Sequence, residues 1–310
     1  MFIVADIGGT NARFACADPQ DPNHLSDIAI HPCADFTYLI DAIRFYLAET
    51  GQEVTGLCLA VAGPVDGDWI DLPNNHWAFS HEALGKELGV PVAIINDFSA
   101  QVLAVSGMKD DELSWVGEAR PSGGKVFAVV GPGTGLGVSA MLPGGDILPS
   151  EGGHVGFAPT NEHEMALLST LWRRRQRVSV ERILSGMGLE NLYWANCVLS
   201  GRERELPAAE ITAGARAGDA NCVAAINDFC QILASFAGDV ALMTGALDGV
   251  YLSGGILPKI MDLLDTDSFR TRFNDKGRFQ AANEATPLAF VLAKNPGLRG
   301  AARAAQLNAG

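Results

Sequence analysis

The sequence predicts an α/β protein built from two domains, and three observations support this prediction. The chain has 310 residues, which is long enough for two domains. One unit occurs twice, at Phe2–Ala17 and at Val126–Leu142: an apolar strand runs into a glycine turn containing a threonine and returns as a second strand. Between residues 35 and 96, helical patterns alternate with buried-strand patterns, as they do in layered α/β domains.

Composition and charge indicate the broad class of protein. Hydrophobic residues make up 48% of the chain and charged residues 19%, which is a globular composition. The formal net charge of −14 argues against nucleic acids and anionic membranes as partners, because both need basic surfaces. It does not exclude ATP, since glycine turns and Mg²⁺ hold phosphates locally. Without a visible signal peptide, an apolar run of membrane length or a Cys-x-x-Cys pair, we expect a cytoplasmic protein with free thiols.

The first glycine turn lies between two strands, and this context favours a phosphate. Phe2–Ala5 has the pattern of a buried strand, Asp6 follows, and the alternation after Gly8-Gly9-Thr10 predicts a hairpin. A dinucleotide fingerprint needs its glycines between a strand and a helix, and the chain has no Walker loop. The turn offers unobstructed backbone N–H groups, and Asp6 suits Mg²⁺ held through water. The alternative is an ordinary tight hairpin with a solvated Asp6.

Two later glycine segments extend this prediction. Gly131–Gly137 joins the strands of the second unit, and two such hairpins facing each other would hold a polyphosphate. The pair Gly254-Gly255 follows a strand at Gly249–Ser253 and leads into a helix start at Ile256–Ile260. We expect a nucleoside to lie at this third segment.

Asn96-Asp97 follows the buried strand Pro91–Ile95. Ligands of open α/β sheets gather beyond the carboxyl ends of strands, and a carboxylate there can accept the proton of a hydroxyl during phosphoryl transfer. From spacing alone, the alternative is that Asp97 is the N-cap of a helix over Phe98–Val105. The two oxygens of one carboxylate can share both roles.

Two further polar residues are candidates for binding a small polar ligand. Glu151 and His154 flank two glycines, and a carboxylate and an imidazole are suitable partners for sugar hydroxyls. The alternative is a solvated loop. From its position alone, Glu181 is interpreted as an acid in the first turn of a helix. The basic run Arg173–Arg177 is interpreted as a solvated helix end, and Asp219–Leu247 as a core helix.

Together these segments resemble a known family. Three of them are similar to the phosphate-1, phosphate-2 and adenosine segments of the sugar-kinase, actin and heat-shock-ATPase superfamily: Asp6–Arg13, Gly131–Gly137 and Leu252–Ile256. Four more narrow the resemblance to the cytoplasmic, non-zinc type of bacterial glucokinase: Ile95–Phe98, Glu151–His154, Ser179–Gly188 and Asn295–Ala302. The match runs in order over essentially the whole chain. Because no cysteine lies between Cys58 and Cys197, the zinc motif of the related repressor/kinase branch is absent and no structural zinc is expected.

The resemblance implies a fold, a reaction and a set of site residues. The fold is two actin-like, ribonuclease H-like α/β domains with mixed sheets facing across a cleft: a small domain of residues 1–107 plus 295–310, and a large domain of residues 108–294. The reaction is ATP-dependent phosphorylation of glucose at the 6-hydroxyl, the first step of glycolysis, by a cytoplasmic homodimer with Asp97 as general base. The implied substrate-binding residues are Asn74, Asn96, Asp97, Glu151, His154 and Glu181. The implied nucleotide-binding residues are Asp6, Gly8, Gly9, Thr10, Asn11, Gly133, Thr134, Gly135, Gly254 and Gly255, with Asp6 also anchoring Mg²⁺ through water.

Two other classes of protein remain open from the sequence. A chaperone-like ATPase of the same superfamily would bind ATP without a sugar, and Glu151, His154 and Glu181 argue against it. A sugar-responsive regulator would bind glucose without phosphorylating it, and Asp97 with the three glycine segments argues against that. The sequence also leaves open whether mannose, glucosamine or fructose competes with glucose, and whether polyphosphate replaces ATP.

Overall fold

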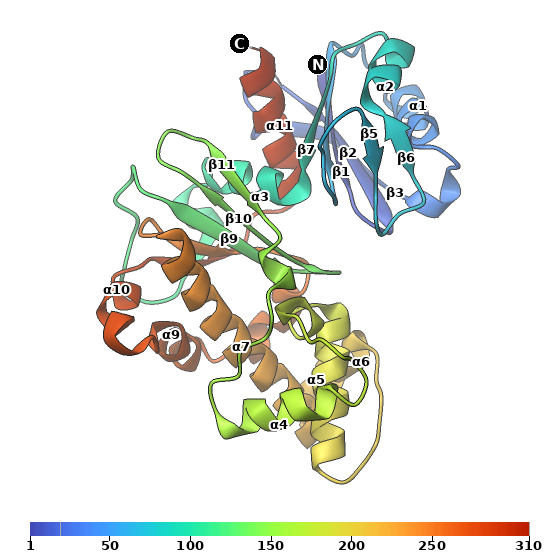
Figure 1. Ribbon diagram of the computed structural model, residues 1–310. Coiled ribbons are helices and arrows are strands. Elements are labelled where there is room, and N and C mark those ends of the chain that lie inside the picture. The colour runs from blue at the N-terminus through green and yellow to red at the C-terminus, as the bar shows by residue number, and fades with distance from the viewer. Residues whose placement is uncertain (19, 310) are drawn as a thin grey trace. The chain divides into compact units, whose positions relative to one another are not determined.

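The computed structural model describes residues 1–18 and 20–309, and its backbone contacts divide the chain into two compact units (Figure 1). Unit 1 consists of residues 1–110 together with the C-terminal segment that begins at Ala293, and unit 2 is Asp111–Leu292. Each unit has its own mixed β-sheet flanked by helices, which confirms the predicted α/β class.

The sheet of unit 1 contains the first predicted hairpin. Its five strands lie in the order β3-β2-β1-β4-β7. Strands β1 and β2 pair antiparallel on either side of the glycine turn, as predicted, whereas β1, β4 and β7 run parallel. The strand bounds are β1 Phe2–Ile7, β2 Asn11–Ala17, β3 Leu25–Pro32, β4 Gly56–Val61 and β7 Val92–Asn96, and a separate ribbon is formed by β5 Trp69–Asp71 and β6 Ala78–Ser80.

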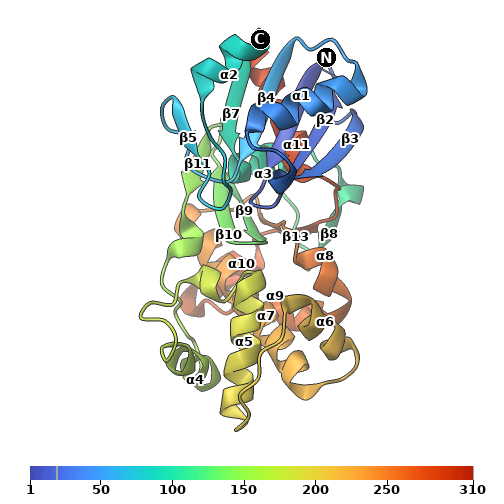
Figure 2. The same cartoon turned by 90° about the vertical axis from the view of Figure 1, so that its right-hand side faces the viewer.

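Helices cover both faces of this sheet (Figures 1 and 2). Ile3 and Ile7 of β1 pack with Ile43 and Tyr46 of α1 (Leu39–Thr50) in one buried cluster, because alternate side chains of a strand face the same side. On the other face, α3 (Asp97–Val105) and α11 (Pro296–Ala309) pack against each other, and α11 also packs on β1 and β4. The remaining helices of unit 1 are α2 His81–Leu88 and the 3₁₀ turn η1 Cys33–Asp35, and the 3₁₀ turn η2 Asp110–Glu112 spans the boundary between the two units.

The start of α1 differs from the prediction, whereas its end agrees. The sequence pattern predicts one helix over Asp35–Thr50 that ends at Gly51, but Cys33–Asp35 forms a separate 3₁₀ turn and Phe36 has extended backbone angles. The regular helix therefore begins at Leu39. It ends at Gly51, whose φ of 61° lies in the left-handed region that glycine adopts without strain.

The sheet of unit 2 contains the second predicted hairpin. Its order is β11-β10-β9-β12-β13-β8. Strands β9 and β10 pair antiparallel around the Gly133–Gly135 turn, and β12 lies parallel to β9. The bounds are β8 Leu113–Trp115, β9 Phe127–Pro132, β10 Leu136–Met141, β11 Ile147–Ser150, β12 Val250–Leu252 and β13 Leu288–Val291.

A long buried helix, α7 (Ala220–Thr244), is the centre of the core of unit 2. It packs against α5, α6 and α9 (Figure 2). Its residues Ile226, Phe229 and Leu233 are buried. Among the described residues, α7 alone is long and apolar enough to cross a membrane, but most of it is buried inside the unit. It is the predicted core helix. The other helices of unit 2 are α4 Glu162–Leu171, α5 Gly186–Leu199, α6 Ala208–Arg216, α8 Leu257–Ile260, α9 Thr266–Asn274 and α10 Gln280–Glu284, with the 3₁₀ turns η3 Gly152–His154, η4 Val180–Arg182, η5 Met261–Leu263 and η6 Gly277–Phe279.

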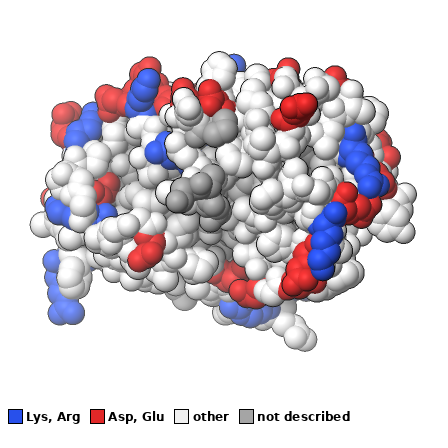
Figure 3. All heavy atoms as spheres, turned by 90° about the horizontal axis from the view of Figure 1, so that it is seen from above, with Lys and Arg blue, Asp and Glu red and all other residues white. Residues whose placement is uncertain are grey.

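The cysteines are buried, and the surface carries charges of both signs. All six cysteines are buried and have free thiols, as predicted. Burial raises the pKa of the Cys58 thiol to about 12, so this thiol is protonated and unreactive at neutral pH. On the face drawn in Figure 3, lysines and arginines lie singly or beside aspartates and glutamates.

Candidate active site

The first group of predicted site residues lies at one edge of the sheet of unit 1. In the parallel strands β1, β4 and β7, Ile7 is paired with Val61 and Val61 with Asn96. The three strands therefore end side by side, with the glycine turn after β1 and Asp97 after β7. This edge holds the carboxyl ends of parallel strands, which is where open α/β sheets bind ligands.

The turn after β1 is held closed by its own backbone and by the segment at Asn74. The N–H group of Gly8 donates to the carbonyl oxygen of Asn11 at 3.0 Å. The backbone of Asn74 lies against Gly9, where an added Cβ would be 2.8 Å from the Asn74 oxygen. Asn75 Nδ2 donates to the carbonyl of Gly8 at 3.0 Å. The structure thus places Asn74 at the turn, and it adds Asn75, for which the only available signal was its position next to Asn74.

Asn96, and not Asp97, is the N-cap of α3, so the interpretation of Asp97 as the cap is wrong. Asn96 has extended backbone angles, and its Oδ1 accepts from the N–H groups of Phe98 at 2.9 Å and Ser99 at 3.2 Å. Its Nδ2 donates to the carbonyl of Gly63 at 3.2 Å, which ties the end of β7 to the end of β4. Asp97 is the first residue of α3, and its Oδ1 lies 2.9 Å from the N–H nitrogen of Phe98.

Asp6 is a partly buried carboxylate on β1. Its Oδ2 lies 3.4 Å from Arg13 Nη1, and the backbone of Gly297, in the first turn of α11, lies against the same carboxylate. Burial raises the pKa of Asp6 above its ordinary value, while the positive charge of Arg13 opposes the rise. A cation nearby would favour the ionised form further.

The donor set around Asp6 fits Mg²⁺ that is bound mainly by water and phosphate. Within residues 1–18 and 20–309, no group of three or more His, Cys, Asp or Glu side chains is placed to hold a metal. Mg²⁺ keeps several waters and takes one or two carboxylates alongside substrate phosphates, so a single carboxylate is sufficient for it.

The second group of predicted residues converges in unit 2. His154 lies on η3, with Nε2 3.7 Å from Glu151 Oε2 and Nδ1 3.9 Å from Glu181 Oε1. Glu151 and His154 are well exposed, whereas the Glu181 side chain is 24% exposed. Two carboxylates and an imidazole thus face one another on the surface of the unit, where they can accept from and donate to a polyhydroxylated ligand.

The cluster of Glu151, His154 and Glu181 contacts the second glycine turn directly. The N–H group of Leu136, the first residue of β10, donates to Glu181 Oε2 at 3.0 Å, and the same oxygen lies against Gly135. Gly153 packs so closely on β10 that a Cβ there would overlap the carbonyl oxygen of Leu136. Glycine at position 153 is therefore required to seat the Glu151–His154 loop on the turn.

The predicted phosphate and nucleoside turns of unit 2 lie next to each other. The N–H group of Gly133 donates to the Gly135 carbonyl at 2.8 Å, which closes the β9–β10 turn. Gly254 has a φ of 134° and packs against the carbonyl of Pro132, a position that no larger residue can occupy. Around Gly133 and Gly255, the space that a side chain would take is open, although the carbonyl of Gly133 itself accepts from the Gly186 N–H group at 2.9 Å.

Arg177 also contacts the segment of His154, although the sequence predicts that the basic run Arg173–Arg177 is a solvated helix end. Its Nη2 donates to the carbonyl oxygen of His154 at 2.6 Å. Arg174 of the same run stacks on Trp194 at 3.6 Å and pairs with Glu205 at 2.6 Å. No sequence signal identified Arg177, because its partner is a backbone carbonyl in a distant loop.

Solved structures share this fold. A glucokinase from an Antarctic psychrotroph has a TM-score of 0.87 and 35% sequence identity, with 98% of each chain covered. A ROK family glucokinase from Streptomyces griseus, solved in complex with glucose and AMPPNP, has a TM-score of 0.68 at 19% identity and 97% coverage of each chain, which shows the fold alone. The fold and its glycine turns define a sugar kinase with two actin-like α/β domains.

Sequence comparison identifies one family within this class of sugar kinases. A family model described as Glucokinase matches residues 3–308. The glucokinase of Chromohalobacter salexigens is 46% identical over 308 residues, which cover 97% of this chain and 96% of that protein. A glucokinase of Neisseria meningitidis serogroup C is 41% identical over 312 residues, which cover 97% and 94%. The chain belongs to the glucokinase family.

Proposed function

We propose that this member of the glucokinase family transfers the γ-phosphoryl group of ATP to the 6-hydroxyl of glucose, with Asp97 as general base. A sugar hydroxyl is a poor nucleophile until a base accepts its proton. The observation that supports Asp97 is its position at the carboxyl end of β7, where Asn96 provides the cap of α3. The Asp97 carboxylate follows directly at the carboxyl end of β7, and its Oδ1 accepts from the Phe98 N–H group at 2.9 Å.

Glu151, His154 and Glu181 are proposed to hold the sugar. Each carboxylate accepts hydrogen bonds from hydroxyls, and the imidazole adds a directional partner. Glu181 Oε2 accepts a hydrogen bond from the Leu136 N–H group, and Oε1 faces His154 and is proposed to accept from the ligand. From unit 1, we assign Asn96 and Asn74 to the same substrate. Asn96 gives one Nδ2 hydrogen to Gly63, and its amide retains a second hydrogen for a sugar hydroxyl.

The glycine turns are proposed to hold the nucleotide. The turns Gly8-Gly9-Thr10-Asn11 and Gly133-Thr134-Gly135 are proposed to present N–H groups to phosphates, with the N–H groups of Gly8 and Gly133 closing the turns. Gly254-Gly255 lies beside the latter turn and is proposed to receive the nucleoside. Asp6 would anchor Mg²⁺ through water. When bound, the ion neutralises charge on the phosphates and on the transferring group.

Three further features rest on the family resemblance. We propose that the protein is a homodimer, that it acts in the cytoplasm, and that glucose 6-phosphate formation places it at the start of glycolysis. Light scattering during size-exclusion chromatography measures the first directly: a mass near twice the 32.7 kDa of the chain supports the dimer, and a single-chain mass contradicts it.

The test of the reaction is a coupled assay of ADP production with Mg-ATP and a panel of hexoses. Wild type should show glucose-dependent turnover, and Asp97→Asn should lose a factor of roughly 10²–10⁴ in kcat while retaining glucose and ATP binding. Asp66→Asn, an exposed aspartate of the same unit, is the matched control and should behave as wild type.

Other outcomes would overturn specific parts of the proposal. ATP turnover indifferent to every sugar would favour the chaperone-like class, and glucose binding without phosphoryl transfer would favour the regulator. Turnover supported by polyphosphate in place of ATP would change the donor. Wild-type kcat in Asp97→Asn would remove the general-base role and leave the reaction intact.

A further inference from the structure

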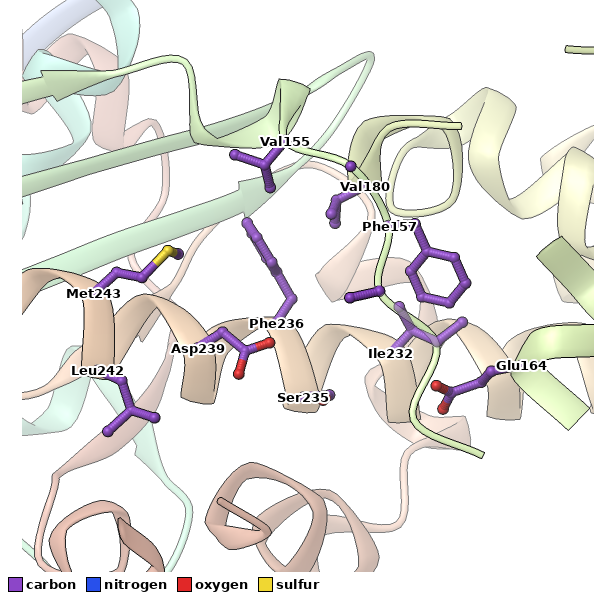
Figure 4. Close-up of a pocket in the computed structure, with 12 residues that line it drawn as sticks. Val155, Phe157, Glu164, Val180, Ile232, Ser235, Phe236, Asp239, Leu242 and Met243 are labelled. Carbon is purple, nitrogen blue, oxygen red and sulfur yellow. The ribbon is translucent and has the colours of Figure 1, made fainter. Parts of the chain in front are cut away.

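A cavity of about 340 Å³ lies in unit 2, between helix α7 and the segment that begins at Val155, the residue after His154 (Figure 4). Val155, Phe157 and Val180 form one wall, and Ile232, Phe236 and Met243 of α7 form the other. The proposed reaction uses none of these side chains. A mostly apolar cavity of this size with a few polar groups is typical of sites for small organic molecules.

The wall nearest the sugar is a short two-stranded ladder. The N–H group of Val180 donates to the carbonyl of Val155 at 2.9 Å, and Gly156 is paired antiparallel with Ser179. In this register Val155 lies opposite Val180, and both valines line the cavity. His154 and Glu181 are the neighbours of these two valines in the chain and belong to the turns η3 and η4. Neither of them is among the residues that line the cavity.

The polar end of the cavity indicates the chemistry of its ligand. The Asp239 carboxylate is half exposed, and its Oδ1 pairs with Lys276 Nζ at 2.8 Å. Lys276 is buried and also donates to Ser235 Oγ at 3.2 Å, so the carboxylate is the exposed partner of this ion pair and the one that a ligand meets. The second oxygen of Asp239 is left to accept from a ligand, and a charged donor gives the strongest such bond. The net charge of −14 also favours a cation over an anion.

We propose that this cavity is an allosteric site for a small amine with an aromatic or branched apolar body, and that its occupation tightens glucose binding. The apolar body packs between Val155, Val180 and the side chains of α7, and the ammonium group donates to Asp239. Packing against the valine pair stabilises the ladder in the arrangement that holds His154 beside Glu181. The effect on glucose rests on the proposed sugar roles of those two residues, whereas binding of the amine does not.

The probe is 2-phenylethylamine, compared with 2-phenylethanol and 3-phenylpropanoate, titrated calorimetrically into the full chain without ATP. The amine should bind at least about tenfold more tightly than the carboxylate, which faces repulsion from Asp239. Asp239→Asn should remove the preference for the amine over the alcohol. Equal binding of all three molecules, or none, overturns the proposal.

Two exposed methionines of unit 2 offer a matched pair of variants. Met243 lines the cavity and is 64% exposed, and Met165 on α4 lies outside it and is 61% exposed. Met243→Trp should fill the mouth of the cavity and abolish amine binding, while Met165→Trp should leave it unchanged. Both variants should retain wild-type turnover in the absence of amine. Identical amine binding by the two variants refutes the assignment of the cavity.

Coupling is measured by titrating glucose with and without saturating amine. The amine should lower the glucose Kd by about fivefold, within the usual range of allosteric coupling, and saturating glucose must tighten the amine by the same factor. Amine binding with no change in glucose overturns the allosteric role. If the amine does not bind and Met243→Trp dissociates a dimer, a second copy of the chain covers the cavity and the proposal is wrong. If the protein binds the amine in a way that depends on Met243 but has no glucose kinase activity, the amine site is supported and the proposed function is wrong.

Discussion

Glu181 connects the proposed sugar site to the phosphate turn, and two substitutions separate these roles. Its Oε2 accepts from the Leu136 N–H group at 3.0 Å, and its Oε1 lies 3.9 Å from His154 Nδ1. In Glu181→Gln, the amide oxygen can keep the bond to Leu136, so the amide NH₂ group replaces the oxygen that faces the sugar. In Glu181→Ala, both interactions are lost.

The expected magnitudes follow from this geometry. A hydrogen bond to a charged group contributes about 1.5–3 kcal/mol, and the 24% exposure of Glu181 places it at the lower end. Glu181→Gln should therefore raise the glucose Kd about tenfold, since about 1.4 kcal/mol corresponds to a factor of ten. The ATP Kd should change by less than about threefold, because the turn keeps its acceptor. Glu181→Ala should weaken both ligands and lower the free energy of unfolding by about 1–2 kcal/mol, since the Leu136 N–H group loses its partner.

Isothermal titration of glucose and of Mg-ATP, with urea unfolding of each variant, measures all three quantities. Glu210→Gln, an exposed glutamate of α6, is the control and should match wild type in every one. The reasoning is refuted if Glu181→Gln weakens glucose and ATP equally, because Glu181 would then only support the turn. Unchanged glucose affinity in the same variant would remove Glu181 from the sugar site altogether.

Three other substitutions test the elements that position the site. Asn96→Ala should lower the free energy of unfolding by about 1 kcal/mol through loss of the α3 cap, and Asn96→Asp should retain it; urea unfolding with equal values for the two would show that the cap is not needed. In Gly153→Ala the added Cβ would overlap the Leu136 carbonyl, and the overpacking cost on the order of 1–3 kcal/mol should raise the glucose KM at least tenfold. Gly156→Ala is the control, because the space around Gly156 is open, and it should match wild type in the coupled assay. Hydrogen bonds from backbone N–H groups lower the pKa of Asp219, the N-cap of α7, so wild type should exceed Asp219→Asn in stability above about pH 4 and lose that advantage as the pH falls through the lowered pKa. Unfolding measured from pH 2 to pH 7 would contradict this if the difference between the two proteins did not depend on pH.

Local patterns were sufficient for the elements that carry the glycine turns. Alternating apolar residues on both sides of Gly8-Gly9 and of Gly133–Gly135 predicted hairpins, because a strand signal and a turn signal are both encoded within a few residues. The same local reasoning offered Asp97 as the cap of α3, whereas the structure has Asn96 in that position. Both residue types suit that position, and only the extended backbone angles of Asn96 decide between them.

Interactions between distant segments required the folded chain. The hydrogen bond from Arg177 to the His154 carbonyl has no sequence signal, since every residue has such a carbonyl. The same holds for the ladder that places Val155 opposite Val180 and so forms the cavity wall.

The amino-acid sequence by itself was enough to predict the α/β class, the two strand–turn–strand units and, through resemblance, the glucokinase family. The sequence was sufficient for these features because they depend on patterns within short stretches of the chain and on the backbone conformations that glycine can adopt. The fold was needed to bring Glu181 onto the Leu136 N–H group, to pack Gly153 on β10 and to form the cavity beside α7. These depend on which surfaces pack together across many residues of intervening chain, and packing is a property of the whole core rather than of any one segment.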